Sequence, residues 1–279
     1  MAFDPASLSA FSARYPASPV RLRHHLTDHP LFAMDRLIAL ARALPEKSVE
    51  YNSGDLLIGQ DPDKTPMNGL SAEETVRRIA DNKSWIVLKN IEQNADYAAL
   101  LESCLGDVAD IAHAATGEMH MREGFIFVSS PGSVTPFHMD PEHNILMQVR
   151  GTKVLTIFPS GAESFLDAEA HEAFHKPGGH RNLPYREEYE GKGEKTELSP
   201  GDALYAPVKA PHWVKVGPEV SVSLSVTWRS EASDAEAHLR RANGWLRGRG
   251  AAPPHPGAHP LRDRAAVLAS RIAERFHRS

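Results

Sequence analysis

The sequence predicts a mainly β protein with helical decorations, and two observations support that prediction. Beyond Gly117 the chain reads as a series of strand-sized runs, rich in β-branched and aromatic residues and separated by Gly, Pro, Ser or Asp. Before that point, and again after Trp228, apolar residues recur mostly at helical spacing. Several short strands in succession are typical of an antiparallel barrel or sandwich, so we expect one β unit flanked by helices.

Length and composition are those of an ordinary globular chain. The 279 residues suffice for one barrel domain with attachments, and 41% apolar with 24% charged residues indicates neither disorder nor a fibrous repeat. The formal net charge of −5 gives no general attraction to nucleic acid or to anionic lipid, so we expect neither direct nucleic-acid binding nor membrane association. Cys104 is the only cysteine, and the first residues show neither a basic leader nor an apolar run. These features predict a cytoplasmic protein without disulfides.

Residues 1–117 are predicted to form a mixed region, more helical than extended, that packs on the barrel. Helical spacing of apolar residues marks the segments 31–44 and 96–110. Between them, Ser71 is followed three residues later by Glu74, a capping-box signature that opens a further helix. This third of the chain also contains the first strand-sized run, SWIVLK.

Residues 118–230 are predicted to form the barrel core, with an insertion at 160–199. With SWIVLK included, the predicted strands lie at 84–89, 123–130, 143–151, 153–160, 202–208, 212–217 and 220–228. The insertion combines a helical piece with a polar, Gly-rich stretch, and a long insertion between barrel strands is more often functional or mobile than padding. Residues 231–279 are predicted to form two helices, because a segment rich in Pro and Gly separates two runs of helical spacing.

The segment TPFHMD contains the first candidate metal ligands. His138 and Asp140 are two residues apart at the start of a strand pattern, so their side chains can point to the same face. Two His and one carboxylate on one face of a metal leave open positions opposite, which is the arrangement of non-haem iron oxygenases. The third ligand must then come from elsewhere. His212 is the best candidate, because it begins another strand and strands far apart in sequence become neighbours when a barrel closes.

The sequence around these residues resembles the jumonji-C and cupin-like hydroxylases, a group of iron(II)- and 2-oxoglutarate-dependent oxygenases, and especially their asparaginyl-hydroxylase branch. The resemblance runs from about Phe125 to Trp228 and rests on ordered blocks: FIFVSSPGSVTPFHMD, HNILMQVRGTK and PGDALYAP followed by a His. It implies a double-stranded β-helix, which is the cupin or jelly-roll barrel. It also implies iron(II) as the metal, 2-oxoglutarate as co-substrate and dioxygen as oxidant.

The resemblance assigns roles to six residues. His138, Asp140 and His212 are implied to be the metal-binding, catalytic set. The residues implied to bind or support the co-substrate are Thr135, Asn144 and Lys153, with Lys153 on the distal carboxylate of 2-oxoglutarate. One feature of the group is absent: the aromatic hydroxyl that contacts 2-oxoglutarate from an earlier strand has no equivalent, since this strand offers only Phe125 and Phe127.

The function implied by the resemblance is hydroxylation of a protein or peptide side chain, coupled to decarboxylation of 2-oxoglutarate to succinate. Four alternatives stay open: a small-molecule hydroxylase, a demethylase, a non-catalytic jumonji-like module that binds a ligand or regulates, and a metal-dependent cupin in which Glu142 is an additional ligand. His143 is expected to lie outside the ligand set. In the resembled branch the helices after the barrel form a homodimer, so a homodimer through residues 231–279 is expected here.

Overall fold

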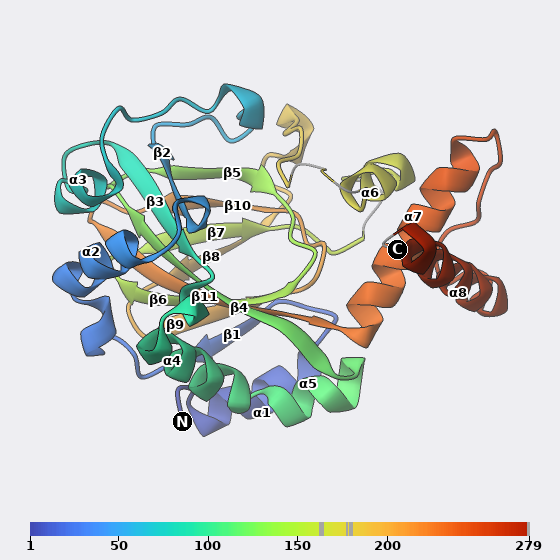
Figure 1. Cartoon of the computed structure of the whole chain (residues 1–279), viewed down its shortest axis with the longest axis horizontal. Coiled ribbons are helices and arrows are strands. Elements are labelled where there is room, and N and C mark those ends of the chain that lie inside the picture. The colour runs from blue at the N-terminus through green and yellow to red at the C-terminus, as the bar shows by residue number, and fades with distance from the viewer. Residues whose placement is uncertain (162–164, 177, 179–180, 278–279) are drawn as a thin grey trace.

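The computed structural model describes residues 1–161, 165–176, 178 and 181–277, and its strands form two antiparallel sheets that face each other (Figure 1). The larger sheet has the order β1 (Val20–Arg23), β9 (Asp202–Ala206), β6 (His143–Arg150), β11 (Ser221–Ser230), β4 (Met119–Ser129), β3 (Ser84–Lys89) and β2 (Val49–Ser53). The smaller sheet has the order β5 (Val134–His138), β10 (His212–Val216), β7 (Lys153–Ile157) and β8 (Glu194–Leu198). The predicted double-stranded β-helix is thereby confirmed.

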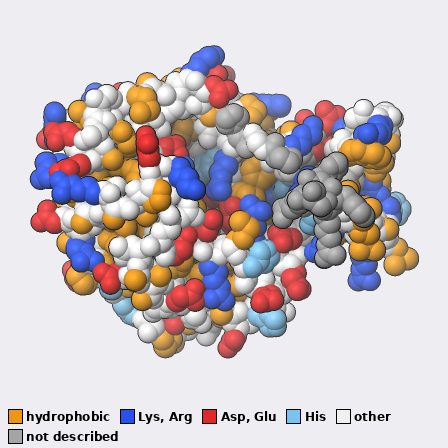
Figure 2. All heavy atoms as spheres, in the orientation of Figure 1, with side chains coloured by type: hydrophobic (Ala, Val, Ile, Leu, Met, Phe, Trp, Pro, Cys, Tyr) orange, Lys and Arg blue, Asp and Glu red, His pale blue; other side chains and the backbone are white. Residues whose placement is uncertain are grey.

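Figure 1 shows the helices of the first third below and to the left of the barrel, and the later helices to its right. Their bounds are α1 (Pro5–Arg14), α2 (Met34–Ala43), α3 (Ala72–Arg77), α4 (Ala95–Gly106), α5 (Ala109–Thr116), α6 (Ala168–Phe174), α7 (Glu231–Arg247) and α8 (Pro260–His277). Within the described ranges, none of these helices is long and apolar enough to cross a membrane. On the face drawn in Figure 2, side chains of both charges are interspersed over the barrel and the helices.

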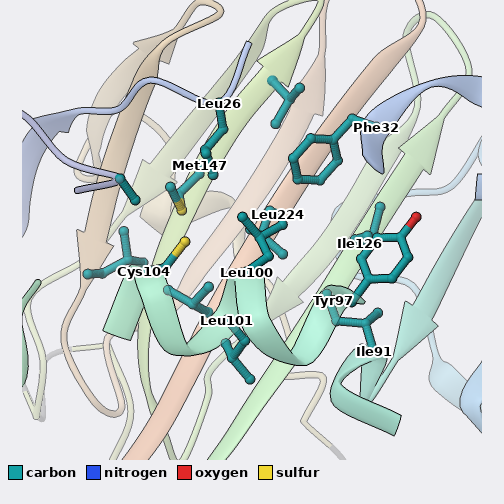
Figure 3. Packing of buried hydrophobic residues seen from close by; sticks show 14 of the residues in the cluster. Leu26, Phe32, Ile91, Tyr97, Leu100, Leu101, Cys104, Ile126, Met147 and Leu224 are labelled. Carbon is teal, nitrogen blue, oxygen red and sulfur yellow. The ribbon is translucent and has the colours of Figure 1, made fainter. Parts of the chain in front are cut away.

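The main hydrophobic core lies between the larger sheet and the helices of the first third. Cys104 of α4 points at Met147 and Leu100 at Leu224, while Tyr97 of the same helix lies beside Ile126 (Figure 3), and all six side chains are buried. Burying a side chain of this size contributes about 1.5–3 kcal/mol, so this layer fixes the position of the sheet from outside. The barrel interior is consequently free to hold polar groups.

Strand β11 shows how the two faces divide. Successive side chains of a strand point to opposite faces, and the run SVSLSVTW alternates small hydroxyl residues with large apolar ones. Val222, Leu224, Val226 and Trp228 belong to the outer core. The hydroxyl residues face the barrel interior, where Ser225 and Thr227 line a cavity between the sheets. This strand therefore supplies both core packing and part of the site.

Several elements were not predicted. Helix α1 begins with an Asp4 cap and a proline at its first position, a signal that the sequence does contain. Strands β1, β2 and β8 are four or five residues long and lie at the edges of the two sheets. Short edge strands owe their structure to pairing with a neighbour, and sequence periodicity cannot reveal that pairing. Because β1, β2 and β3 come from residues 1–117, the larger sheet extends across the boundary expected at 117/118.

Two turn glycines predict a measurable difference in stability. Gly151, between β6 and β7, and Gly132, between β4 and β5, have left-handed φ angles of 66° and 72°. A Cβ on Gly151 would lie 2.4 Å from the carbonyl oxygen of Val220, whereas nothing lies within 4 Å of a Cβ on Gly132. We expect Gly132→Ala to lower the free energy of unfolding by about 1 kcal/mol, from strain alone, and Gly151→Ala by at least about 3 kcal/mol. Denaturant unfolding measures both, and equal losses would contradict the predicted backbone clash.

Candidate metal centre

The three predicted metal ligands meet at one end of the smaller sheet. His138 ends β5 and His212 begins β10, and the antiparallel register pairs these two residues directly. Their ring centroids are 4.1 Å apart, and Nε2 of His212 lies 3.8 Å from Oδ2 of Asp140. One ligand atom from each of the three residues lies within 4.8 Å of the others. The structure thus brings together residues that are more than 70 positions apart.

Both histidines are held in the form that binds a metal. Nδ1 of His138 donates to the carbonyl of Pro136 at 2.7 Å, and Nδ1 of His212 donates to that of Ala210 at 2.9 Å. A carbonyl oxygen only accepts, so the proton sits on Nδ1 and the lone pair of Nε2 is free for a metal. Burial, reinforced by the neighbouring His212, lowers the pKa of His138 to about 4, which keeps this ring neutral near pH 7.

Asp140 is fixed by hydrogen bonds to both carboxylate oxygens. Oδ1 accepts from Nη1 of Arg181 at 2.9 Å, and Oδ2 accepts from Nδ2 of Asn144 at 3.3 Å. The Asn144 carbonyl in turn accepts from the Ser225 hydroxyl at 2.8 Å. Burial alone would raise the pKa of Asp140. Arg181 and the two imidazoles lower this pKa by more than burial raises it, so the net pKa lies well below its ordinary range. The carboxylate is therefore ionised.

The site opens into a cavity of about 270 Å³ between the two sheets. All six residues implied by the resemblance line it: Thr135, His138, Asp140, Asn144, Lys153 and His212. Its other walls include apolar side chains of β4, β6, β7 and β10, namely Phe125, Phe127, Leu146, Leu155 and Val214. His212 pairs with the last residue of β7, and Lys153 is the first. Four residues of strand, about 13 Å, thus separate the backbone at the ligands from that at the lysine.

Lys153 is a buried cation, with 4% of its surface exposed. Nζ donates to the Ser223 hydroxyl at 2.7 Å and lies 5.4 Å from the ring centroid of Phe127. Burial lowers the pKa of Lys153 to about 7. In the part of the chain that the structure describes, no carboxylate forms an ion pair with it. A desolvated ammonium without a counter-ion favours an anionic ligand in the cavity.

Two other residues near the ligand pair lie outside the group of possible metal ligands. Glu142 is buried, and Oε1 accepts from Arg181 at 3.3 Å and from Arg229 at 3.1 Å, so its carboxylate faces two guanidinium groups. His143 points the other way, into the outer core, where it stacks on Trp228 with a centroid distance of 5.2 Å. The alternative of a cupin with Glu142 as an additional ligand therefore lacks geometric support.

Three residues of the site are not among the six that the sequence analysis assigned. Ser223 and Ser225 contact Lys153 and Asn144, and the alternation of hydroxyl and apolar residues along β11 is the signal that could have found them. Arg181 contacts Asp140 from 41 positions away, out of the insertion. Nothing in the sequence indicates where that loop returns to the barrel.

Comparison with known proteins gives one family and a set of related folds. A family model described as a cupin-like domain matches residues 61–234. The lysine-specific demethylase JMJ30 of Arabidopsis thaliana is 35% identical over 115 residues, which is 38% of this chain and 26% of the length of that protein. The activity of a protein so much longer than the matched region does not transfer by itself.

Among solved structures, the ribosomal oxygenase YcfD of Escherichia coli is similar in fold. Its complex with cobalt and 2-oxoglutarate superposes with a TM-score of 0.53 and 17% identity, over 94% of this chain and 65% of the other. A second structure of the same protein gives a TM-score of 0.55 and 17% identity, over 98% and 69%. At this identity the likeness concerns the fold alone.

The buried ammonium predicts a stability effect that depends on pH. The pKa of Lys153 is about 7 in the folded protein and returns to its ordinary 10.5 on unfolding. Between these values the unfolded state binds more protons, so the cost of burying the charge is complete below pH 7 and disappears toward pH 10. Without ligand, we expect the free energy of unfolding of Lys153→Met to exceed that of the parent by about 1–3 kcal/mol at pH 6.5. The difference should be smaller at pH 9.5.

Urea unfolding at the two pH values measures this difference. Lys195→Met is the matched control, because Lys195 is exposed on β8. A difference for Lys153→Met that is constant with pH would contradict the burial argument.

Proposed function

The chain belongs to the cupin-like domain family, and on that premise we propose that it is an iron(II)- and 2-oxoglutarate-dependent dioxygenase. One observation carries the proposal: two imidazoles and an ionised carboxylate meet at one end of a cavity that also contains a buried lysine, with which no carboxylate of the described residues forms an ion pair. The complex of YcfD with cobalt and 2-oxoglutarate, a protein of similar fold, supports it.

The donor set fits a first-row divalent metal with open positions. Nε2 of His138, Nε2 of His212 and one oxygen of Asp140 would hold iron(II). When bound, iron(II) with 2-oxoglutarate supplies a hydroxylating chemistry in which one atom of dioxygen enters the substrate C–H bond and the other enters succinate, with release of carbon dioxide. The chain's own part is to keep the three ligands on one side, so that the cavity side stays open.

The cavity has a place for each end of the co-substrate. Lys153 would bind the distal carboxylate, and Thr135 of β5 lines the path between it and the metal ligands. Ser223 lies directly across from Phe127 in the β11–β4 register and touches the lysine, so we assign its hydroxyl the part that an aromatic hydroxyl plays in the resembled group. The apolar walls would limit the access of water to the reacting centre.

A protein or peptide side chain is the substrate that we propose. The names of the two similar proteins, a ribosomal oxygenase and a lysine-specific demethylase, support this class. The second name favours demethylation as an alternative, since hydroxylating an N-methyl group releases formaldehyde. A gain of one oxygen atom by the product identifies hydroxylation, formaldehyde identifies demethylation, and turnover of a free metabolite identifies a small-molecule hydroxylase.

We also propose a cytoplasmic location. Cys104, the single cysteine, is buried and unbridged within the outer core, which is compatible with a reducing compartment.

Turnover of 2-oxoglutarate without an added substrate tests the proposal. The protein with iron(II), ascorbate and 2-oxoglutarate should form succinate, and His138→Ala should abolish that formation by removing a ligand. Lys153→Met should raise the KM for 2-oxoglutarate about 10–100-fold, because a charge-assisted hydrogen bond contributes about 1.5–3 kcal/mol. Lys195→Met is the control. Failure to bind iron and 2-oxoglutarate would contradict the proposal. A cellular function that survives His138→Ala would favour a non-catalytic module.

A homodimer through the C-terminal helices is the assembly that we propose. α8 packs on α7 and leaves Leu261, Leu268 and Ile272 exposed at its surface. We expect the mass of a dimer in sedimentation at micromolar concentration, and the mass of a monomer for Leu268→Glu, since the new charge would have to be buried at the contact. Ala258→Glu, in the exposed linker before α8, is the control. A monomeric parent would contradict the proposal.

A further inference from the structure

The insertion between β7 and β8 returns to the metal ligands through its main chain. The amide of Leu183 donates to the carbonyl of Phe137 at 2.8 Å, and the amide of Met139 donates to the carbonyl of Arg181 at 3.2 Å. A β-bridge also joins Asn182 to His138. Residues 181–183 therefore lie along the end of β5, and this pairing fixes where the Arg181 side chain begins.

The Arg181 guanidinium donates to one carboxylate oxygen of Asp140, and the other oxygen lies nearer to His212. Nη1 donates to Oδ1 at 2.9 Å, whereas Oδ2 is the oxygen 3.8 Å from Nε2 of His212. A hydrogen bond to Oδ1 prevents rotation of the carboxylate about its own axis and keeps Oδ2 directed at His212. The contact thus selects the oxygen available to a metal.

Glu142 anchors this guanidinium from the far side. Its oxygens lie 3.3 Å from Nη1 and Nη2 of Arg181, and Oε1 also accepts from Arg229 of β11 at 3.1 Å. Glu142 is 4% exposed, so the anchor cannot exchange freely with water. Arg181 is consequently held between two carboxylates, on the wall of the cavity.

We propose that Arg181 is a positioning residue for the metal site, supplied by the insertion between β7 and β8; the proposal rests on the proposed function. Two effects oppose each other, since a guanidinium repels a divalent cation but also orients its carboxylate ligand. The repulsion is the smaller, because two carboxylates offset the charge and 48% of the side chain is exposed to screening water. Removing Arg181 therefore weakens metal binding. If Arg181 acted only as a counter-ion of the carboxylates, its removal would strengthen metal binding.

Binding of Mn(II), followed by the paramagnetic resonance signal of the free ion, tests this inference on the full chain. We expect Arg181→Ala to raise the Kd for Mn(II) about 10–100-fold, the range for loss of a group that orients a metal ligand. Arg181→Lys should recover part of the affinity, because an ammonium can bond to Asp140 but cannot span both carboxylates. Arg186→Ala is the matched control, since Arg186 lies in the same insertion and, among the described residues, pairs with the exposed Glu188 and the Tyr189 ring.

The outcomes separate this inference from the proposed function. A parent protein that binds no Mn(II) contradicts the metal site itself. A parent that binds, with Arg181→Ala binding equally or more tightly, overturns the positioning role. Thermal unfolding in the presence of a chelator should show that all variants are folded. If Arg181→Ala is not folded, the Mn(II) affinity of Arg181→Lys is the test. An affinity of Arg181→Lys equal to that of the parent would then overturn the proposal.

Discussion

The register between β5 and β10 is the constraint on which the site depends. His138 and His212 face each other only because the two strands pair antiparallel at these residues, with a bulge immediately after His212. A slip of one residue would turn one imidazole to the opposite face of the sheet and remove the site. The register is held from both sides, because β10 also pairs along its whole length with β7, which places Lys153 at the other end of the same cavity. The pairing of β10 with its two neighbours therefore sets both the geometry of the candidate ligands and the position of the lysine.

Polar groups inside the barrel are tolerated because the stabilising core lies outside it. The larger sheet packs its apolar face against α1, α2, α4 and α5, and the hydroxyl face of β11 is turned to the cavity. Three hydrogen bonds fix polar groups there: Ser225 donates to Asn144, Asn144 donates to Asp140, and Lys153 donates to Ser223. Buried polar groups that are fully paired specify one arrangement, whereas unpaired ones would cost stability.

The barrel and the three candidate ligands that it brings together could be predicted because their signals are local. Strand-sized runs bounded by turn residues gave the strands of the barrel, and blocks of sequence around His138 and His212 marked the ligands. The remaining features depend on tertiary pairing. Strand β1 forms by pairing with β9, 179 to 185 positions later, and the amide of Asn144 donates to Asp140. The guanidinium of Arg181 reaches Asp140 from a loop whose path no periodicity describes.

The charges at the two ends of the cavity explain why a lysine with a depressed pKa suits this site. A divalent metal on two neutral histidines and one carboxylate carries a net charge of about +1, and the protonated lysine at the far end carries another. A dicarboxylate would offset both charges at once, and its distal end would restore the ammonium that burial disfavours. Binding above pH 7 is then linked to uptake of a proton by Lys153, so affinity for a dianion falls as pH rises. A neutral ligand of the same length would gain from neither end, so a bound metal and the lysine together would favour a dicarboxylate over uncharged molecules of that size.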